Sequence, residues 1–200
     1  MRSQLAVALR MVAVTLVLAG LLYPLAVTGL AQLLFPRQAG GSMVVVDGRC
    51  VGSLLIGQQF TSPAYFQGRP SAAGPTGYDA GASGGSNLGP TSARLRDRAT
   101  AEAGRLRLEN PSAAGPLPAE LVAASASGLD PHLSPEAALW QAPRVAAARG
   151  VPLAAVQAAV TAHVEGRPLG FLGEPRVNVL LLNLDLDRRF GPPPAALPSR

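Results

Sequence analysis

The 200-residue chain contains no lysine, one cysteine and few aromatic residues, which make up 4% of the sequence. A single cysteine, Cys50, excludes an internal disulfide. The absence of lysine excludes a phosphate-binding P-loop, because that motif needs a Lys to reach the β- and γ-phosphates. The net charge of +5 therefore comes from arginine alone.

The arginines are not arranged as a nucleic-acid surface. In the richest stretch, residues 94–107, they alternate with Asp97 and Glu102. Proteins that bind single strands combine basic grooves with aromatic side chains on which bases stack, and aromatic residues are scarce here. We therefore expect no nucleic-acid partner.

Catalytic and metal-binding residue types are also sparse. His132 and His163 are the only histidines. Together with Asp130 and several serines they supply the parts of a hydrolytic triad or a zinc site by type. The spacing supports neither, since there is no nucleophile elbow and no histidine pair on one helix face. The sequence predicts no catalytic residue and no metal site, and Asp130-Pro131 indicates a turn.

What the sequence does contain is a long apolar run. Residues 11–36 carry no charge, are rich in Leu, Val and Ala, and lie between Arg10 and Arg37. About 20 apolar residues cross a bilayer core, and the run is longer than the roughly 7–15 residues of a cleaved signal core. We expect a retained transmembrane anchor, with Tyr23-Pro24 as a point where it can bend.

The flanking charges predict the orientation of this anchor. Arg2, Arg10 and the terminal amine stand before it, and Arg37 alone follows it. By the positive-inside rule the N-terminus lies in the cytoplasm and the rest is exported. We expect a cytoplasmic N-terminus and anchor at residues 1–36, a linker at 37–42, an exported soluble domain at 43–190 and a disordered proline-rich tail at 191–200.

The exported part is predicted to be a single α+β domain. It is rich in loops, because the chain has 22 Gly and 19 Pro, and it should carry short helices and a small sheet. The expected elements follow from apolar periodicity, caps and breakers: a hairpin of 43–46 and 51–56 with a turn lengthened by Arg49-Cys50, helices at 91–108 and 135–149, a short helical piece after Pro118, a helix from Pro152 to near Gly166, and a buried strand at 176–186.

A glycine-rich loop, residues 82–89, precedes one of these helices. Such a loop could hold a phosphate on its backbone N–H groups. The missing lysine favours the other interpretation, a purely structural loop.

Four blocks of sequence together resemble one family. They are residues 66–72 (FQGRPSA), 82–91 (ASGGSNLGPT), 124–135 (ASASGLDPHLSP) and the core of 163–184 (GFLGEPRVN). In this order they resemble the KdpC family, the C subunit of the bacterial Kdp potassium-transporting P-type ATPase. The resemblance covers nearly the whole chain.

The resemblance implies a place in the bacterial inner membrane beside three partners, namely a channel-like A subunit, a P-type ATPase B subunit and a small F subunit. The chain itself has neither the Asp-Lys-Thr-Gly phosphorylation motif of a pump nor a Thr-Val-Gly-Tyr-Gly filter. Subunit contacts are expected in the loop blocks, at Ser83, Gly84, Gly85, Asn87, Asp130, His132, Glu174 and Arg176.

Two roles stay open at this point. The first is a non-catalytic accessory subunit that stabilises the assembly of the channel-like and ATPase subunits and supports potassium uptake. The second, implied by the family, is a catalytic chaperone that raises the ATP affinity of the ATPase subunit, with Gln141 before Arg144-Val145-Ala146 as the nucleotide contact. ATP, shared with that subunit, is the one candidate ligand. From the residues alone, Gln141 is a helix-surface amide, and in an exported domain cytoplasmic ATP cannot reach it.

Overall fold

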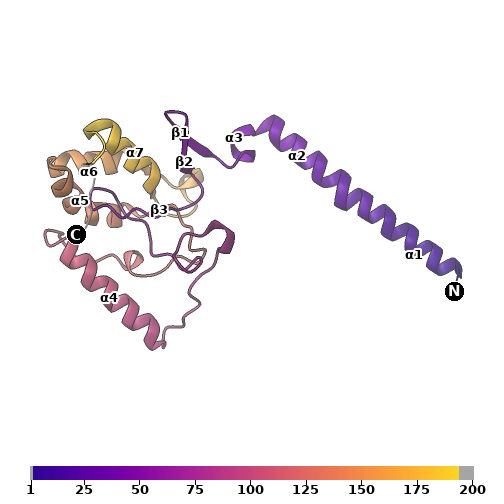
Figure 1. Cartoon of the computed structure of the whole chain (residues 1–200), viewed down its shortest axis with the longest axis horizontal. Coiled ribbons are helices and arrows are strands. Elements are labelled where there is room, and N and C mark those ends of the chain that lie inside the picture. Colours follow the sequence, from indigo (N-terminus) through magenta and orange to yellow (C-terminus); the bar gives the residue numbers. More distant parts are fainter. Residues whose placement is uncertain (1, 194–200) are drawn as a thin grey trace. The chain divides into compact units, whose positions relative to one another are not determined.

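The computed structural model describes residues 2–193 (Figure 1). The chain divides into two compact units, and the boundary between them in the sequence falls between Ser53 and Leu54. The predicted tail lies outside the described residues from 194 onward. The first unit holds six elements: α1 (Arg2–Thr15), a π-helical stretch (Leu16–Leu22), α2 (Tyr23–Leu34), α3 (Pro36–Ala39), β1 (Met43–Val46) and β2 (Arg49–Ser53).

The N-terminal elements form one continuous apolar helix. Ser3–Leu34 spans 32 residues and contains an 18-residue window with a mean hydropathy of 2.4. It is the one helix in residues 2–193 that is long and apolar enough to cross a membrane. At about 1.5 Å rise per residue it exceeds the roughly 30 Å of a hydrocarbon core. The predicted apolar N-terminal helix is confirmed, and it begins earlier than residue 11.

The helix widens to a π-helix immediately before Tyr23-Pro24. Pro24 has no N–H, and its ring would clash with the carbonyl four residues back in a regular α-helix. In the wider turn, the Tyr23 N–H bonds to the carbonyl of Leu18, five residues back. The π-helical stretch thus lies at the point where the sequence predicts a bend, as is common for insertions into a helical ladder.

The predicted hairpin is present, with a tighter turn than expected. Asp47 and Gly48 both have positive φ, 49° and 75°, as a two-residue type I′ turn requires. Arg49 and Cys50 therefore belong to β2 instead of lengthening the turn. The register slips by one residue between Val44 and Val45, a bulge, and the strand ends at Ser53, not at residue 56.

The second unit is an α+β domain, as predicted. Its three-stranded sheet has the order β3-β5-β4 and is antiparallel throughout. The elements are, in chain order, 3₁₀ turn η2 (Ala80–Ala82), α4 (Ala93–Glu109), η3 (Ala119–Leu121), β3 (His132–Leu133), α5 (Pro135–Arg149), α6 (Leu153–Ala162), β4 (Val164–Glu165), η4 (Pro168–Gly170), β5 (Arg176–Asn178) and α7 (Val179–Phe190).

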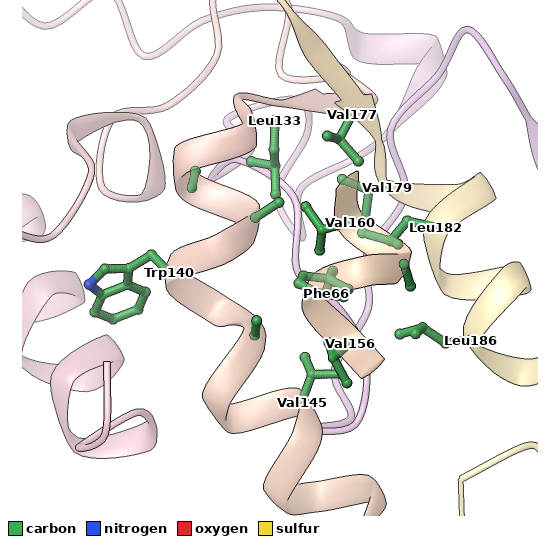
Figure 2. Close-up of a cluster of buried hydrophobic side chains, with 14 of the residues drawn as sticks. Phe66, Leu133, Trp140, Val145, Val156, Val160, Val177, Val179, Leu182 and Leu186 are labelled. Carbon is green, nitrogen blue, oxygen red and sulfur yellow. The ribbon is translucent and has the colours of Figure 1, made fainter. Parts of the chain in front are cut away.

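The core of this unit lies between α5, α6, α7 and the short sheet (Figure 2). In Figure 2, Trp140 projects from the opposite side of α5, away from the other labelled side chains. Burying such side chains is the main favourable term in folding. The largest fully buried apolar side chains of this core are Phe66, Leu133, Val145, Val156, Val160, Val177, Leu182 and Leu186.

Helix α5 begins and ends where the sequence predicts. The Ser134 hydroxyl accepts a hydrogen bond from the Ala137 N–H at 3.1 Å, and Pro135 occupies the first turn. The helix continues through Pro143 and ends at Gly150, whose φ of 68° is left-handed. Its ends are therefore fixed by local chemistry.

The predicted strand at 176–186 is wrong beyond Asn178. The Asn178 side chain accepts from the Leu181 N–H at 3.1 Å and so begins helix α7 at Val179. A short apolar run indicates burial but does not separate a buried strand from a buried helix. Here the cap at Asn178 decides for the helix, which buries Leu182 and Leu186 on one face.

We predict that Asn178→Ala lowers the free energy of unfolding by about 2 kcal/mol, because it removes this cap and leaves the Leu54 carbonyl without its 2.9 Å partner. Urea unfolding of the detergent-solubilised chain, followed by fluorescence of its only tryptophan, measures the change. Asn178→Ser keeps a capping hydroxyl and should recover part of the loss. Equal losses in the two variants would contradict the capping role.

Candidate functional site

Two buried amide side chains hold one short backbone segment from opposite sides. Asn183 of α7 accepts from the Phe66 N–H at 2.8 Å and donates to the Phe66 carbonyl at 2.9 Å. Gln141 of α5 accepts from the Gln67 N–H at 2.9 Å and donates to the Gln67 carbonyl at 3.0 Å. Successive residues of an extended chain bond to opposite sides. The two amides, which we call the amide clamp, thus take the place of neighbouring strands.

Two arginines of α5 fix the chain just before the clamp. Arg144 is buried and donates to the Pro63 and Tyr65 carbonyls, at 2.6 and 3.1 Å, and to the Gln141 side-chain oxygen at 2.8 Å. Burial lowers the pKa of Arg144 to about 10, so the guanidinium is still charged at pH 7. Arg149 donates to the Ala64 carbonyl at 2.7 Å.

Gln141 is therefore not a helix-surface amide, and that expectation is wrong. Only 1% of its surface is exposed, because α5 packs this face against the 63–67 segment. Its side-chain oxygen already accepts two hydrogen bonds and its NH₂ group donates one. A nucleotide contact through Gln141 would have to replace bonds that hold the fold.

The glycine-rich loop packs against the second loop block. The Gly84 N–H donates to the Ser127 carbonyl at 2.9 Å, and the Ser83 hydroxyl donates to the same oxygen at 3.0 Å. A Cβ on Gly85 would lie 2.8 Å from the Ala126 carbonyl oxygen, which is too close. Gly85 allows the two backbones to approach, and the Gly84 N–H is used inside the protein.

Ser71 and Tyr78 tie the same junction to the first block. The Ser71 hydroxyl donates to the Gly128 carbonyl at 2.6 Å and accepts from the Tyr78 N–H at 2.7 Å. The Tyr78 hydroxyl donates to the Arg69 carbonyl at 2.6 Å. Burial, with the charge of Asp130, raises the pKa of Tyr78 to about 12, so the phenol keeps its proton at pH 7.

Asp130 and His132 lie where this junction meets the sheet. Asp130 pairs with Arg69 at 3.1 Å and accepts from the His132 N–H at 3.0 Å, which is the predicted turn. Burial and the positive charge of Arg176 lower the pKa of His132, so its imidazole is neutral at pH 7. The two residues hold local structure, and His132 pairs with Asn178 in the sheet.

The other predicted contacts are Asn87, Glu174 and Arg176. Asn87 is exposed, with a positive φ of 49°. Glu174 forms an exposed ion pair with Arg167, and Arg176 pairs with Glu165 at 2.9 Å. The structure thus gathers Ser83, Gly84, Gly85, Asp130 and His132 around one loop junction. It places Glu174 in the loop between β4 and β5, and Arg176 at the start of β5.

A cleft of about 620 Å³ opens between the 59–78 segment and α4. Its ionisable lining side chains are Tyr78, Glu102, Arg105 and Glu109, and Arg105 is paired with both glutamates. The positive charge of Arg105 is thus neutralised by the two glutamates, and no nucleophilic side chain in this lining is paired with a base. The cleft therefore does not resemble a hydrolytic site. Within residues 2–193 no group of three or more His, Cys, Asp or Glu could hold a metal ion.

Comparison with known proteins decides the family. A family model described as KdpC, the K⁺-transporting ATPase c chain, matches residues 5–188. The chain belongs to the KdpC family. A potassium-transporting ATPase KdpC subunit from Myxococcus xanthus is 69% identical over 200 residues, covering 100% of this chain and 94% of that protein. The Nitratidesulfovibrio vulgaris KdpC subunit is 61% identical over 181 residues, covering 89% and 92%.

Sequence reasoning missed the residues that hold this KdpC chain together. Asn183 lies in a run that indicates a strand, and Arg144 and Arg149 have the sequence pattern of solvated helix residues. The one usable signal was that Gln67 lies within the first family block, residues 66–72. Nothing in the local sequence distinguishes a buried amide from an exposed one.

We predict that Gln141→Ala lowers the free energy of unfolding by about 3 kcal/mol, because the Gln67 N–H and carbonyl and the buried Arg144 guanidinium each lose a partner. Urea unfolding monitored by Trp140 fluorescence measures it. Gln157→Ala, at an exposed site of α6, is the matched control and should change stability by less than about 0.5 kcal/mol. A Gln141→Ala variant as stable as this control would refute the clamp.

Proposed function

We propose that this chain is a non-catalytic accessory subunit that stabilises the assembly of a potassium-transporting ATPase. The amide clamp is the main support for this proposal. Its two polar side chains, which are the best suited to bind a ligand, already form hydrogen bonds with the chain's own backbone. The domain is therefore suited to present a fixed surface to other proteins. Its relatives are named as subunits of a potassium-transporting ATPase.

The partners that we propose are a channel-like subunit, a P-type ATPase subunit and a small third subunit. The apolar helix Ser3–Leu34 packs against them within the bilayer of the bacterial inner membrane. The N-terminus of this helix lies in the cytoplasm, and the domain from residue 43 onward lies on the other side of the membrane. In that position the domain supports potassium uptake by holding the assembly together.

One observation favours the second role, a chaperone that raises the ATP affinity of the ATPase subunit. The cleft beside α4 includes Gln67, whose backbone Gln141 holds, and it is large enough for a small ligand. Calorimetric titration of the detergent-solubilised chain with ATP tests this role. No heat at millimolar nucleotide would remove direct binding, whereas saturable heat that Gln67→Ala abolishes would support it.

We predict that deleting this gene leaves the remaining subunits unable to assemble stably. A tag on the ATPase subunit should then recover little of the channel-like subunit, and potassium-stimulated ATP hydrolysis in membranes should fall to the level without potassium. The full chain supplied from a plasmid restores both. Normal assembly and normal potassium-stimulated ATP hydrolysis in the deletion strain would contradict the assembly role.

A further inference from the structure

The turn at residues 128–132, which we call the junction turn, bonds to several parts of the domain that are distant from it in sequence. Asp130 of this turn forms the ion pair with Arg69. Backbone carbonyls of the turn accept hydrogen bonds from three further partners, namely the Gly57 N–H at 2.8 Å, the Ser71 hydroxyl at 2.6 Å and the Val179 N–H at 3.0 Å. Loosening of this one turn would therefore release all of these partners.

The last residue of the junction turn, His132, lies in a cluster of charged side chains. Its Nδ1 atom lies 3.8 Å from Asp130 Oδ1, and its side chain is only 24% exposed. The charges that act on His132 come from its own turn through Asp130, from β5 through Arg176 and from β4 through Glu165. Asp130 is paired with Arg69, and Arg176 is paired with Glu165 at 2.9 Å. The two positive and two negative charges balance while His132 is neutral.

A proton on His132 would upset this balance. It would add a third positive charge beside Arg69 and Arg176, in a side chain that is mostly shielded from water. Burial and the charge of Arg176 lower the pKa of His132, and the charges of Glu165 and Asp130 oppose this shift without reversing it. The closed turn therefore binds this proton less readily than a hydrated histidine does. As the pH falls, any state of the chain in which His132 reaches water becomes more populated.

We propose that the junction turn is a pH switch, which acid loosens by placing a proton on His132. Loosening separates Asp130 from Arg69 and frees the Gly128 carbonyl from Ser71, so the loop blocks come apart where they meet. Histidine suits this task because its charge changes between pH 5 and 8. The use of the switch rests on the proposed position of the domain outside the cytoplasm, where the pH follows that of the medium.

Hydrogen exchange of the detergent-solubilised full chain tests the switch. The amides of Gly57 and Val179 donate to carbonyls of the junction turn, so their exchange reports its opening. We expect their protection factors to fall severalfold from pH 7.5 to pH 5. The upper limit is about thirtyfold, for a histidine of ordinary pKa in the open turn that stays neutral in the closed one.

A pair of histidine variants separates this proton from the other effects of acid. His132→Gln stays neutral at both pH values, so the fall in protection at Gly57 and Val179 should disappear. His163→Gln, at the other histidine of the chain, is the matched control and should keep the fall. An equal fall in His132→Gln and the native chain, or no fall in the native chain, would overturn the proposal.

Titration of the native chain by NMR provides a test that needs no folded variant. The imidazole signal of His132 is followed from pH 8 to pH 4. We expect a midpoint below 6.5, because the pKa of His132 is lowered from that ordinary value. A midpoint at or above 6.5 would refute the switch even if His132→Gln does not fold.

The outcomes also separate this inference from the proposed function. Both measurements use the isolated chain, so they give their answer whether or not the chain stabilises an assembly. If the switch is refuted while gene deletion still prevents assembly of the other subunits, the assembly role stands without it.

Discussion

The domain depends on one constraint, which is that the backbone at Phe66 and Gln67 runs through the interior without strand partners. Buried backbone N–H and carbonyl groups must be hydrogen-bonded. Here Asn183 satisfies Phe66 and Gln141 satisfies Gln67, from helices on opposite sides. Helices α5 and α7 are therefore bridged by a segment more than seventy residues before Gln141 in the chain. The short sheet and the apolar core are arranged around this crossing.

This arrangement shapes what the chain can do. Polar groups of the loop blocks, such as the Gly84 N–H and the Ser71 hydroxyl, bond to carbonyls of residues 127 and 128 and hold the loops in place. The cleft beside α4 faces outward, and so do Leu169 and Phe171 in the loop between β4 and β5. A body with a rigid interior and loops held in place is suited to docking. Membership of the KdpC family supplies the assembly in which such docking has a use.

Local chemistry made part of the fold predictable. The apolar run, the Ser134 cap and the Gly150 terminus each carry their cause in neighbouring residues, and the elements lie where those causes predict. The prediction of a strand at 176–186 was wrong beyond Asn178, because an apolar run indicates burial and not backbone conformation. The N-cap at Asn178 begins a helix there instead.

The candidate site was predictable to a different degree. Family blocks named the loops that meet at Ser83 and Asp130, but no local pattern could show that Gln141 faces inward, because burial of an amide depends on long-range packing. Glu174 and Arg176 were named from the last of these blocks, and the structure pairs them with Arg167 and Glu165. The exposure of Leu169 and Phe171 was not predictable, because it is a property of the folded surface.

The proposed assembly role requires the domain to lie outside the cytoplasm, away from ATP, and the native chain allows a direct measurement of its location. Cys50 is its only cysteine, is free and exposed, and follows the apolar helix in the β1–β2 hairpin. Intact cells are treated with a membrane-impermeant maleimide, and cells carrying Cys50→Ser give the background. Labelling of Cys50 in intact cells is the predicted result. Labelling only after lysis would place the domain in the cytoplasm and contradict the account.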